Sequence, residues 1–169
     1  MEEEQEIFEV IDESGIFIRT ATREECHSGS NLIHRAVHCF VFNDRGGLFL
    51  QKRSKTKIIQ PGKWDISIGG HVLAKESFEE ALIRESKEEL GLLLKTSDFL
   101  YQYIWKCQRE TELVRTYETT IPFKTKIVWN TNEIDDGKFW STEEILMAIE
   151  KAPETFTPNF LYEIKRFIG

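Results

Sequence analysis

Three glutamates with helical spacing could bind a metal ion. Glu85, Glu88 and Glu89 lie in a segment, 76–90, that has helical character. At about 100° per residue, Glu85 and Glu89 lie on the same stripe of the helix as the apolar Phe78. At positions 85 and 89 a plain amphipathic helix would have Leu or Ile. Carboxylates this close repel one another, and the helix dipole adds to the repulsion. A hard divalent cation such as Mg²⁺ would relieve this repulsion. The alternative is that the three glutamates form a solvated acidic face.

The elements that must position these carboxylates alternate between strands and helices. The acidic helix is predicted to begin near Ser77 and to end at Gly91. A capping pattern at 141–144 and Thr157-Pro158 predict two further helices near the C-terminus. Strands are predicted at 8–11 and 16–18 as a hairpin, and at 36–42, 48–50, 64–68, 99–105 and 118–128. This order indicates an α/β or α+β sandwich.

Composition limits the classes of protein to consider. The chain has 169 residues with 40% hydrophobic and 30% charged residues, which fits one soluble globular domain. Its net charge of −7 disfavours binding to a nucleic-acid polymer. No apolar run approaches the ~18 residues of a membrane helix, and the first six residues are acidic, unlike a secretory signal. We therefore expect a cytoplasmic protein that does not bind membranes.

The acidic segment also has a family resemblance. Three parts of the sequence resemble the Nudix box: Gly70, then Glu76 after five intervening residues, then the run 84–92 after seven more. Ser86 stands in place of the usual aliphatic residue. The resemblance implies a mixed β-sheet sandwiched between α-helices. It also implies that residues 1–169 form a single Nudix hydrolase domain, with an N-terminal β-hairpin extension at about 6–22.

The resemblance further implies roles for particular residues. Mg²⁺, with Mn²⁺ as a substitute, would be bound by Glu85, Glu88, Glu89 and the carbonyl of Gly70. Glu76 and Arg84 would join the loop to the helix through an ion pair. The catalytic set would comprise Glu88, Glu89 and Glu118. In this family the metal polarises the phosphoanhydride and helps to generate the attacking hydroxide, as in general metal-ion catalysis.

Outside the box, the chain resembles the Nudix subfamily that includes isopentenyl diphosphate isomerase. The resemblance extends from about residue 23 to 123, and it implies that Arg23, Arg53 and Lys57 bind the substrate diphosphate, as Lys and Arg are suited to do. For Arg53 and Lys57 the alternative is a solvated polar loop. The isomerases have a catalytic Cys where this chain has Gly69, and one of their two strand carboxylates aligns with Thr116. Both differences favour an isomerase-like Nudix hydrolase.

A second metal site is also implied by this resemblance. His27, His34, His71 and Glu118 align with isomerase ligands, and such a set suits Zn²⁺ or Mn²⁺. The alternative is that His34 is a buried strand residue and His71 a polar wall of the cleft. A structural zinc finger is set aside because Cys26, His27, His34 and His38 have unsuitable spacing, and His38 is expected in or near the core.

The predicted function is Mg²⁺-dependent hydrolysis of a diphosphate linkage in a small molecule, such as a nucleoside diphosphate derivative. Two alternatives are an isopentenyl diphosphate isomerase-like enzyme and a catalytically silent Nudix ligand-binding domain. The complete carboxylate set favours hydrolysis. Tyr101, Tyr103 and Trp105 alternate along one predicted strand and are expected to form core or cleft wall.

Overall fold

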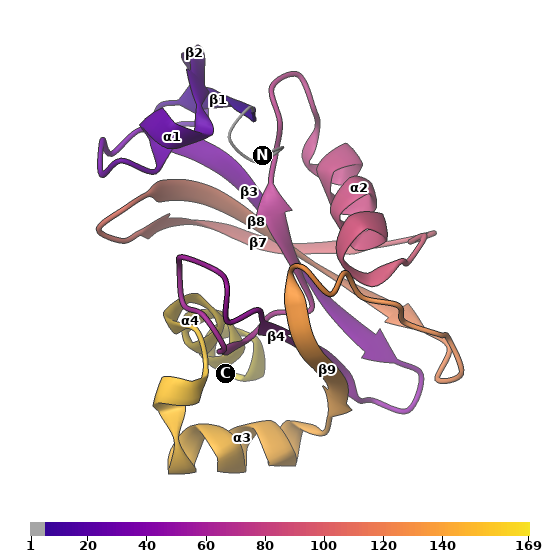
Figure 1. The fold of residues 1–169 in the computed structure, drawn as a ribbon. Helices are drawn as coiled ribbons and strands as arrows, with labels where there is room; N and C mark the ends of the chain where they lie inside the picture. Colours follow the sequence, from indigo (N-terminus) through magenta and orange to yellow (C-terminus); the bar gives the residue numbers. More distant parts are fainter. Residues whose placement is uncertain (1–5) are drawn as a thin grey trace.

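A computed structural model of the chain describes residues 6–169 and shows one mixed sheet with helices on both sides (Figure 1). The acidic segment 1–5 lies outside the described residues. The strands are β1 (Ile7–Ile11), β2 (Phe17–Thr22), β3 (Ile33–Asn43), β4 (Leu48–Arg53), β5 (Trp64–Asp65), β6 (Ile68–His71), β7 (Asp98–Lys106), β8 (Thr111–Ile121) and β9 (Ile134–Trp140). The α-helices are α1 (Arg23–Cys26), α2 (Phe78–Leu90), α3 (Thr142–Lys151) and α4 (Pro158–Ile168). None of the helices within 6–169 is long and apolar enough to span a membrane.

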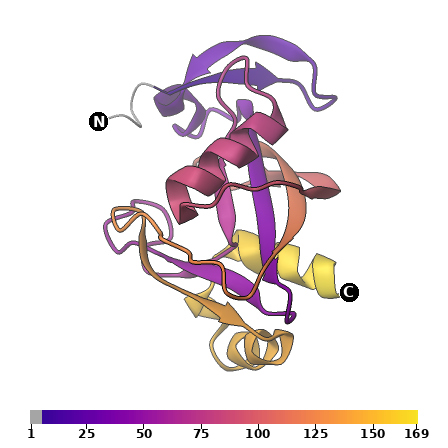
Figure 2. The same ribbon diagram turned by 90° about the vertical axis from the view of Figure 1, so that its right-hand side faces the viewer.

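Strand β3 organises the sheet. It pairs antiparallel with β1, β4 and β6 and parallel with β8 along its whole length. Helices α2 and α4 lie on opposite sides of β3 and its neighbours (Figures 1 and 2). Because successive side chains of a strand point to opposite faces, Val37, Cys39 and Val41 join the cluster under α2, whereas Phe40 packs with residues of α4.

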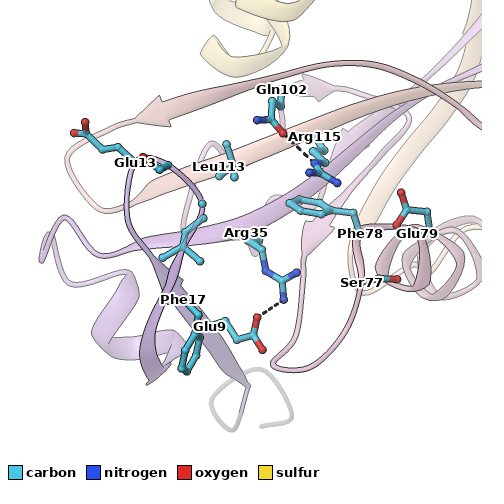
Figure 3. Close-up of a pocket in the computed structure, with 13 residues that line it drawn as sticks. Glu9, Glu13, Phe17, Arg35, Ser77, Phe78, Glu79, Gln102, Leu113 and Arg115 are labelled. Carbon is cyan, nitrogen blue, oxygen red and sulfur yellow. Dashed lines mark hydrogen bonds and ion pairs between the residues drawn. The ribbon is translucent and has the colours of Figure 1, made fainter.

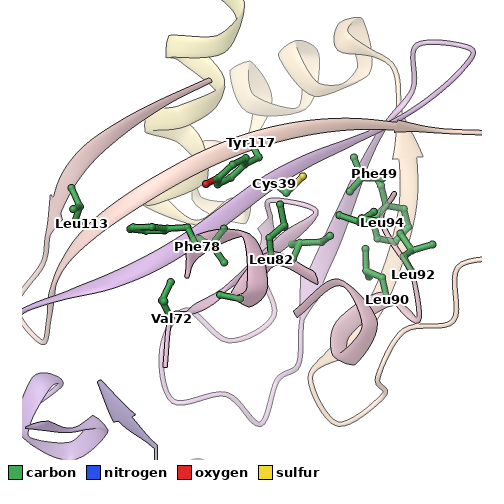
Figure 4. Packing of buried hydrophobic residues seen from close by; sticks show 14 of the residues in the cluster. Cys39, Phe49, Val72, Phe78, Leu82, Leu90, Leu92, Leu94, Leu113 and Tyr117 are labelled. Carbon is green, nitrogen blue, oxygen red and sulfur yellow. The ribbon is translucent and has the colours of Figure 1, made fainter. Parts of the chain in front are cut away.

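The main core lies between the sheet and α2 (Figure 4). Phe78, Ala81, Leu82 and Leu90 are all buried, and they pack against the odd-numbered residues of β3. Burial of a side chain such as Leu82 stabilises the fold by about 1.5–3 kcal/mol. This packing fixes the rotation of α2, and therefore the direction of the carboxylates on its last two turns.

The predicted ends of α2 are confirmed. Ser77 is the N-cap, and its hydroxyl accepts a hydrogen bond from Glu80 N while the Glu80 side chain accepts from Ser77 N. Gly91 follows the last turn at φ +62°, a left-handed conformation that glycine adopts without strain. The N-caps predicted for the C-terminal helices are also present, at Ser141 of α3 and Thr157 of α4.

Three features of the strand prediction were wrong. The strand expected at 118–128 is instead β8, which ends at Ile121, because Pro122 has no N–H to continue a ladder. The strand expected at 64–68 is divided into β5 and β6, which pair with different neighbours. Strand β9 was missed, since Asp135, Asp136 and Gly137 have low strand propensity and are held in place by pairing with β4.

Candidate metal-binding and active site

The acidic helix presents two carboxylates to the backbone of β6. A Cβ added at Gly70 would lie 2.1 Å from Glu85 Cδ, so only glycine permits this approach. Glu89 accepts hydrogen bonds from Gly69 N (3.1 Å) and Gln51 Nε2 (3.2 Å). Glu88, one turn from Glu85, is mostly exposed. Two of the three predicted carboxylates therefore converge on the Gly69-Gly70 strand.

Arg84 joins this strand to the helix. Its guanidinium donates to both oxygens of Glu76 (2.8 and 2.9 Å) and to the carbonyl of His71 (2.9 Å). It also reaches Glu85 (2.8 Å) and Glu88 (3.3 Å). The predicted pairing of Glu76 with Arg84 is confirmed. Ser86, the departure from the family pattern, is buried and donates to the carbonyls of Ile83 and Leu92.

The electrostatics of the acidic site fit a divalent cation. Burial raises the pKa of Glu85 to about 7 despite its contact with Arg84. Burial and the charge of Glu85 raise the pKa of Glu89 well above its ordinary value, and Glu133 adds to the repulsion. These carboxylates resist ionisation together, so a bound cation would compensate a charge that the protein alone leaves unbalanced. Glu133, in the loop before β9, was not predicted as a neighbour of the site.

Three histidines from separate elements form a second cluster. His27 follows α1, His34 lies in β3 and His71 ends β6, and one ligand atom from each lies within 4.8 Å of the others and of Glu110. The Nε2 atoms of His27, His34 and His71 lie 2.8, 4.0 and 3.8 Å from Glu110 Oε2. This buried oxygen has no well-directed hydrogen bond among the described residues. Burial and the nearby imidazoles lower the pKa of His34 to about 4, which favours the neutral, ligating form.

A second carboxylate lies beside this cluster. Glu112 Oε1 is 3.1 Å from His71 Nε2 and 3.7 Å from His34 Nε2. Glu110 and Glu112 are two residues apart, so their side chains leave the chain on the same side. Three imidazoles and two carboxylates that converge in this way fit a divalent transition metal.

The expected participation of Glu118 in this cluster is corrected. Glu118 is six residues beyond Glu112 on β8, which at ~3.4 Å per residue places it roughly 20 Å along the strand. No hydrogen bond or ion pair within residues 6–169 joins Glu118 to either carboxylate or imidazole set. The resemblance had placed the two strand carboxylates at 116 and 118, whereas the structure has them at Glu110 and Glu112. The spacing Glu110-Thr111-Glu112 was the signal that could have identified the correct pair.

The three predicted phosphate-binding cations lie in two places. Arg23 lies next to the imidazole cluster, 3.4 Å from His71 Nδ1, and donates to Glu6 (2.6 Å). Arg53 lies at the end of β4 and pairs with Asp65 (3.4 Å). Lys57, in the following loop, pairs with Glu133. Glu133 also affects Glu89, so Lys57 belongs to the surroundings of the acidic site.

A cavity of about 440 Å³ lies away from both clusters (Figure 3). It is bounded by the β1–β2 hairpin, the start of α2 and strands β7 and β8, and it contains Arg35, Phe78 and Arg115. Arg35 is paired with Glu9 (2.9 Å), and Arg115 lies over the Phe78 ring. None of the carboxylates of the acidic site and none of the residues of the imidazole cluster lines this cavity.

Comparisons with known proteins identify the class. The family model described as NUDIX domain matches residues 32–160. A Nudix hydrolase from Nostoc sp., described as uncharacterized, is 34% identical over 143 residues, which cover 83% of this chain and 82% of the relative. Isopentenyl-diphosphate Delta-isomerase 1 of Photorhabdus laumondii is 26% identical over 159 residues, 91% of this chain and 90% of that protein. The crystal structure of DR0079 from Deinococcus radiodurans superposes with a TM-score of 0.82 at 24% identity, covering 95% and 98% of the two chains.

The fold and the acidic helix therefore define a Nudix-domain protein. The chain belongs to the Nudix family and is a Nudix hydrolase enzyme. Its relatives include proteins named as isomerases as well as hydrolases, and enzymes of this family generally use a divalent metal such as Mg²⁺. The general activity supported by this membership is hydrolysis of a diphosphate linkage.

Proposed function

We propose that this enzyme uses Mg²⁺ to hydrolyse the phosphoanhydride bond of a small-molecule diphosphate, such as a nucleoside diphosphate derivative. The observation that carries the proposal is the convergence of the buried carboxylates Glu85 and Glu89 on the backbone of Gly69 and Gly70. Glu85, Glu88, Glu89 and the Gly70 carbonyl would hold the cation. A divalent cation held there supplies Lewis-acid polarisation of the phosphoanhydride.

The other residues of the site position the substrate and the ligands. Arg84 donates to Glu85 and to the carbonyl of His71, and so holds Glu85 next to the end of β6. Arg53, at the end of β4, and Lys57, in the loop that follows, would donate to the diphosphate in place of their present carboxylate partners. Arg23 would approach from the side of the imidazole cluster. The net charge of −7 disfavours a nucleic-acid polymer as substrate.

We also propose that the imidazole cluster binds a second divalent metal, Zn²⁺ or Mn²⁺. The ligands would be His27, His34, His71, Glu110 and Glu112, whose donor atoms already converge. The test is elemental analysis of protein purified without a chelator or a His tag, before and after reconstitution with Zn²⁺ or Mn²⁺. We expect a stoichiometric transition metal in the parent and none in the His34→Ala/His71→Ala variant. Absence of metal from the reconstituted parent would contradict this assignment.

The proposed hydrolysis is tested with a panel of diphosphates in the presence of Mg²⁺, with identification of the products. The panel should contain nucleoside diphosphates, nucleoside diphosphate sugars and isoprenoid diphosphates. We expect release of a phosphorylated product from at least one compound, and no release when Mg²⁺ is chelated. No turnover of any compound with Mg²⁺ or Mn²⁺ would contradict the proposal.

Isomerase activity is the second candidate, and the paired carboxylates Glu110 and Glu112 favour it more than the sequence suggested. Gly69 argues against it, because glycine has no side chain to transfer a proton. We predict no useful conversion of isopentenyl diphosphate to dimethylallyl diphosphate by pure protein with Mg²⁺ and Zn²⁺. Rapid formation of dimethylallyl diphosphate would show this prediction to be wrong. A Cβ at Gly69 would lie 3.2 Å from His38 Cδ2, so the ring, which is held by Glu163, must shift to admit a Cys there. We therefore predict that Gly69→Cys alone does not give full activity.

A further inference from the structure

A buried ion pair lies on the side of the sheet that faces α4. His38 of β3 and Glu163 of α4 are 125 residues apart, and His38 Nδ1 lies 2.7 Å from Glu163 Oε2. The Glu163 side chain is fully buried, and its other oxygen accepts a hydrogen bond from the Thr116 hydroxyl. His38 was expected to be a core histidine, and it is nearly so, with 12% of its side chain exposed.

The second ring nitrogen of His38 has no hydrogen-bond partner in the part of the chain that the structure describes. Within residues 6–169, no hydrogen bond is made by His38 Nε2, and this atom is not among the fully buried polar atoms that lack a partner. Burial alone would favour the neutral ring, but Glu163, Asp65 and Glu112 outweigh it and raise the pKa of His38 to about 9. At neutral pH the ring is therefore protonated, and its Nε2–H has no hydrogen-bond acceptor among the described residues.

The His38 side chain lies beside Gly69, next to the acidic site. In the sheet, His38 is paired with Gly69 of β6. A Cβ at Gly69 would lie 3.4 Å from His38 Nε2, whereas a Cβ at Gly70 would meet Glu85. Successive residues of a strand face opposite sides, so Glu85 lies on one side of β6 and His38 on the other. Among the described strands β6 pairs only with β3, so a diphosphate bound at Gly70 would place its organic group around the other edge of β6, past Gly69, to reach His38.

We propose that His38 contacts the organic group of the substrate and selects groups with a hydrogen-bond acceptor over hydrocarbon groups. Glu163 is the positioning residue that holds the ring. This inference rests on the proposed diphosphate hydrolysis and narrows its substrate class to diphosphates with a polar organic group. A hydrocarbon group placed here would remove water from a charged donor without replacing the hydrogen bond, which is unfavourable. A carbonyl, hydroxyl or ring-nitrogen acceptor would satisfy it.

The first test is the substrate preference of the parent enzyme. The polar probes are uridine diphosphate, uridine diphosphate glucose and ADP-ribose, and the hydrocarbon probes are 3-methylbutyl diphosphate and geranyl diphosphate. We expect kcat/KM to be higher for at least one polar probe than for both hydrocarbon probes. A hydrocarbon probe as the best substrate would overturn the inference while leaving diphosphate hydrolysis intact. No turnover of any probe would mean that the proposed function itself has failed.

The second test separates a substrate contact from a purely structural ion pair. The His38→Leu/Glu163→Gln variant removes both charges together, so that no buried charge is left unpaired. We expect it to reduce the preference for the best polar probe over geranyl diphosphate by about tenfold to a hundredfold, the range of a charge-assisted hydrogen bond. Inorganic diphosphate, which has no organic group, is the matched control, and its affinity with Mg²⁺ should be the same in both proteins. An unchanged preference would make the pair structural.

A spectroscopic test needs no variant with an altered core. The chain has four histidines, so imidazole ¹⁵N signals of the parent can be resolved, and His38→Gln identifies the signals of His38. We expect the His38 Nε2 signal to move when the best polar probe binds with Ca²⁺ in place of Mg²⁺. It should remain in place when inorganic diphosphate binds. A His38 signal that does not respond to the bound polar probe would overturn the inference.

Discussion

The two metal-binding clusters differ in their charge and in the way the chain builds them. The acidic site brings Glu85 and Glu89 together from one helix, and burial together with like charge raises the pKa of both. The imidazole cluster takes His27, His34, His71 and Glu110 from four separate segments, and its rings and carboxylates have compensating charges. The acidic site is therefore the one whose electrostatics most require a cation.

This difference leads to different expectations for the two sites. Removing one charge from the acidic site should relieve repulsion in the fold and yet abolish cation binding. Removing one carboxylate from the imidazole cluster should instead leave buried positive or unsatisfied groups behind. The predictions below test this contrast, beginning with the largest expected effect.

The largest effect is expected for Glu89→Gln. This change removes the charge that faces Gly69 and nearly preserves the shape, so we expect a loss of at least about 100-fold in kcat. Stability of the metal-free protein should be unchanged or higher, because a like charge leaves the cluster. Steady-state kinetics and thermal unfolding measure both quantities. Glu150→Gln, an exposed glutamate of α3, is the control, and a parental rate for Glu89→Gln would exclude Glu89 as a ligand.

The next effect concerns the carboxylate of the imidazole cluster. Glu110→Gln removes the oxygen around which the three Nε2 atoms converge, so we expect Zn²⁺ affinity to fall at least about tenfold, as for a lost charged contact. Glu118→Gln, on the same strand but roughly 20 Å away, is the matched control and should retain parental affinity. Titration with a competing chelator measures both. Loss of Zn²⁺ from the Glu118 variant alone would reverse the assignment.

The same contrast explains what could be predicted from the sequence. The acidic site lies on one helix, so periodicity alone identified the stripe with Glu85 and Glu89, and capping residues located its ends. The imidazole cluster depends on how β3, β6 and β8 are aligned, and a shift of six residues along the chain replaced Glu110 and Glu112 with Thr116 and Glu118. His38 and Glu163 are 125 residues apart, and no local pattern could relate them. Strand register and long-range pairing were the missing information.

A smaller effect is expected for Lys57, a basic residue beside the acidic site. Lys57 pairs with Glu133, which in turn affects Glu89. If Lys57 exchanges this partner for the substrate diphosphate, Lys57→Ala should lower kcat/KM by roughly tenfold or more. The melting temperature should change little, as for a loop residue. Lys55→Ala, an exposed neighbour in the same loop, is the control; normal kinetics with a large stability loss would make Lys57 structural.

The smallest effect is a pH dependence of stability in the chelated, metal-free protein. The folded-state pKa of Glu85 is about 7, above its ordinary value of 4.5, because burial disfavours its charged form. The folded state therefore binds this proton more tightly than the unfolded state, and the resulting stability is present below pH 4.5 and lost as pH rises toward 7.

Other groups titrate in this range, so the measured quantity is the difference between the parent and Glu85→Gln. We expect the parent to lose a few degrees more in melting temperature between pH 5 and pH 7.5, on the scale of about 2–4 °C per kcal/mol. Mg²⁺ should remove this difference at pH 7.5 by binding the ionised carboxylates. Parallel curves of melting temperature against pH for the two proteins would show that the pKa of Glu85 is not raised. The proposed electrostatic difference between the acidic site and the imidazole cluster would then be wrong.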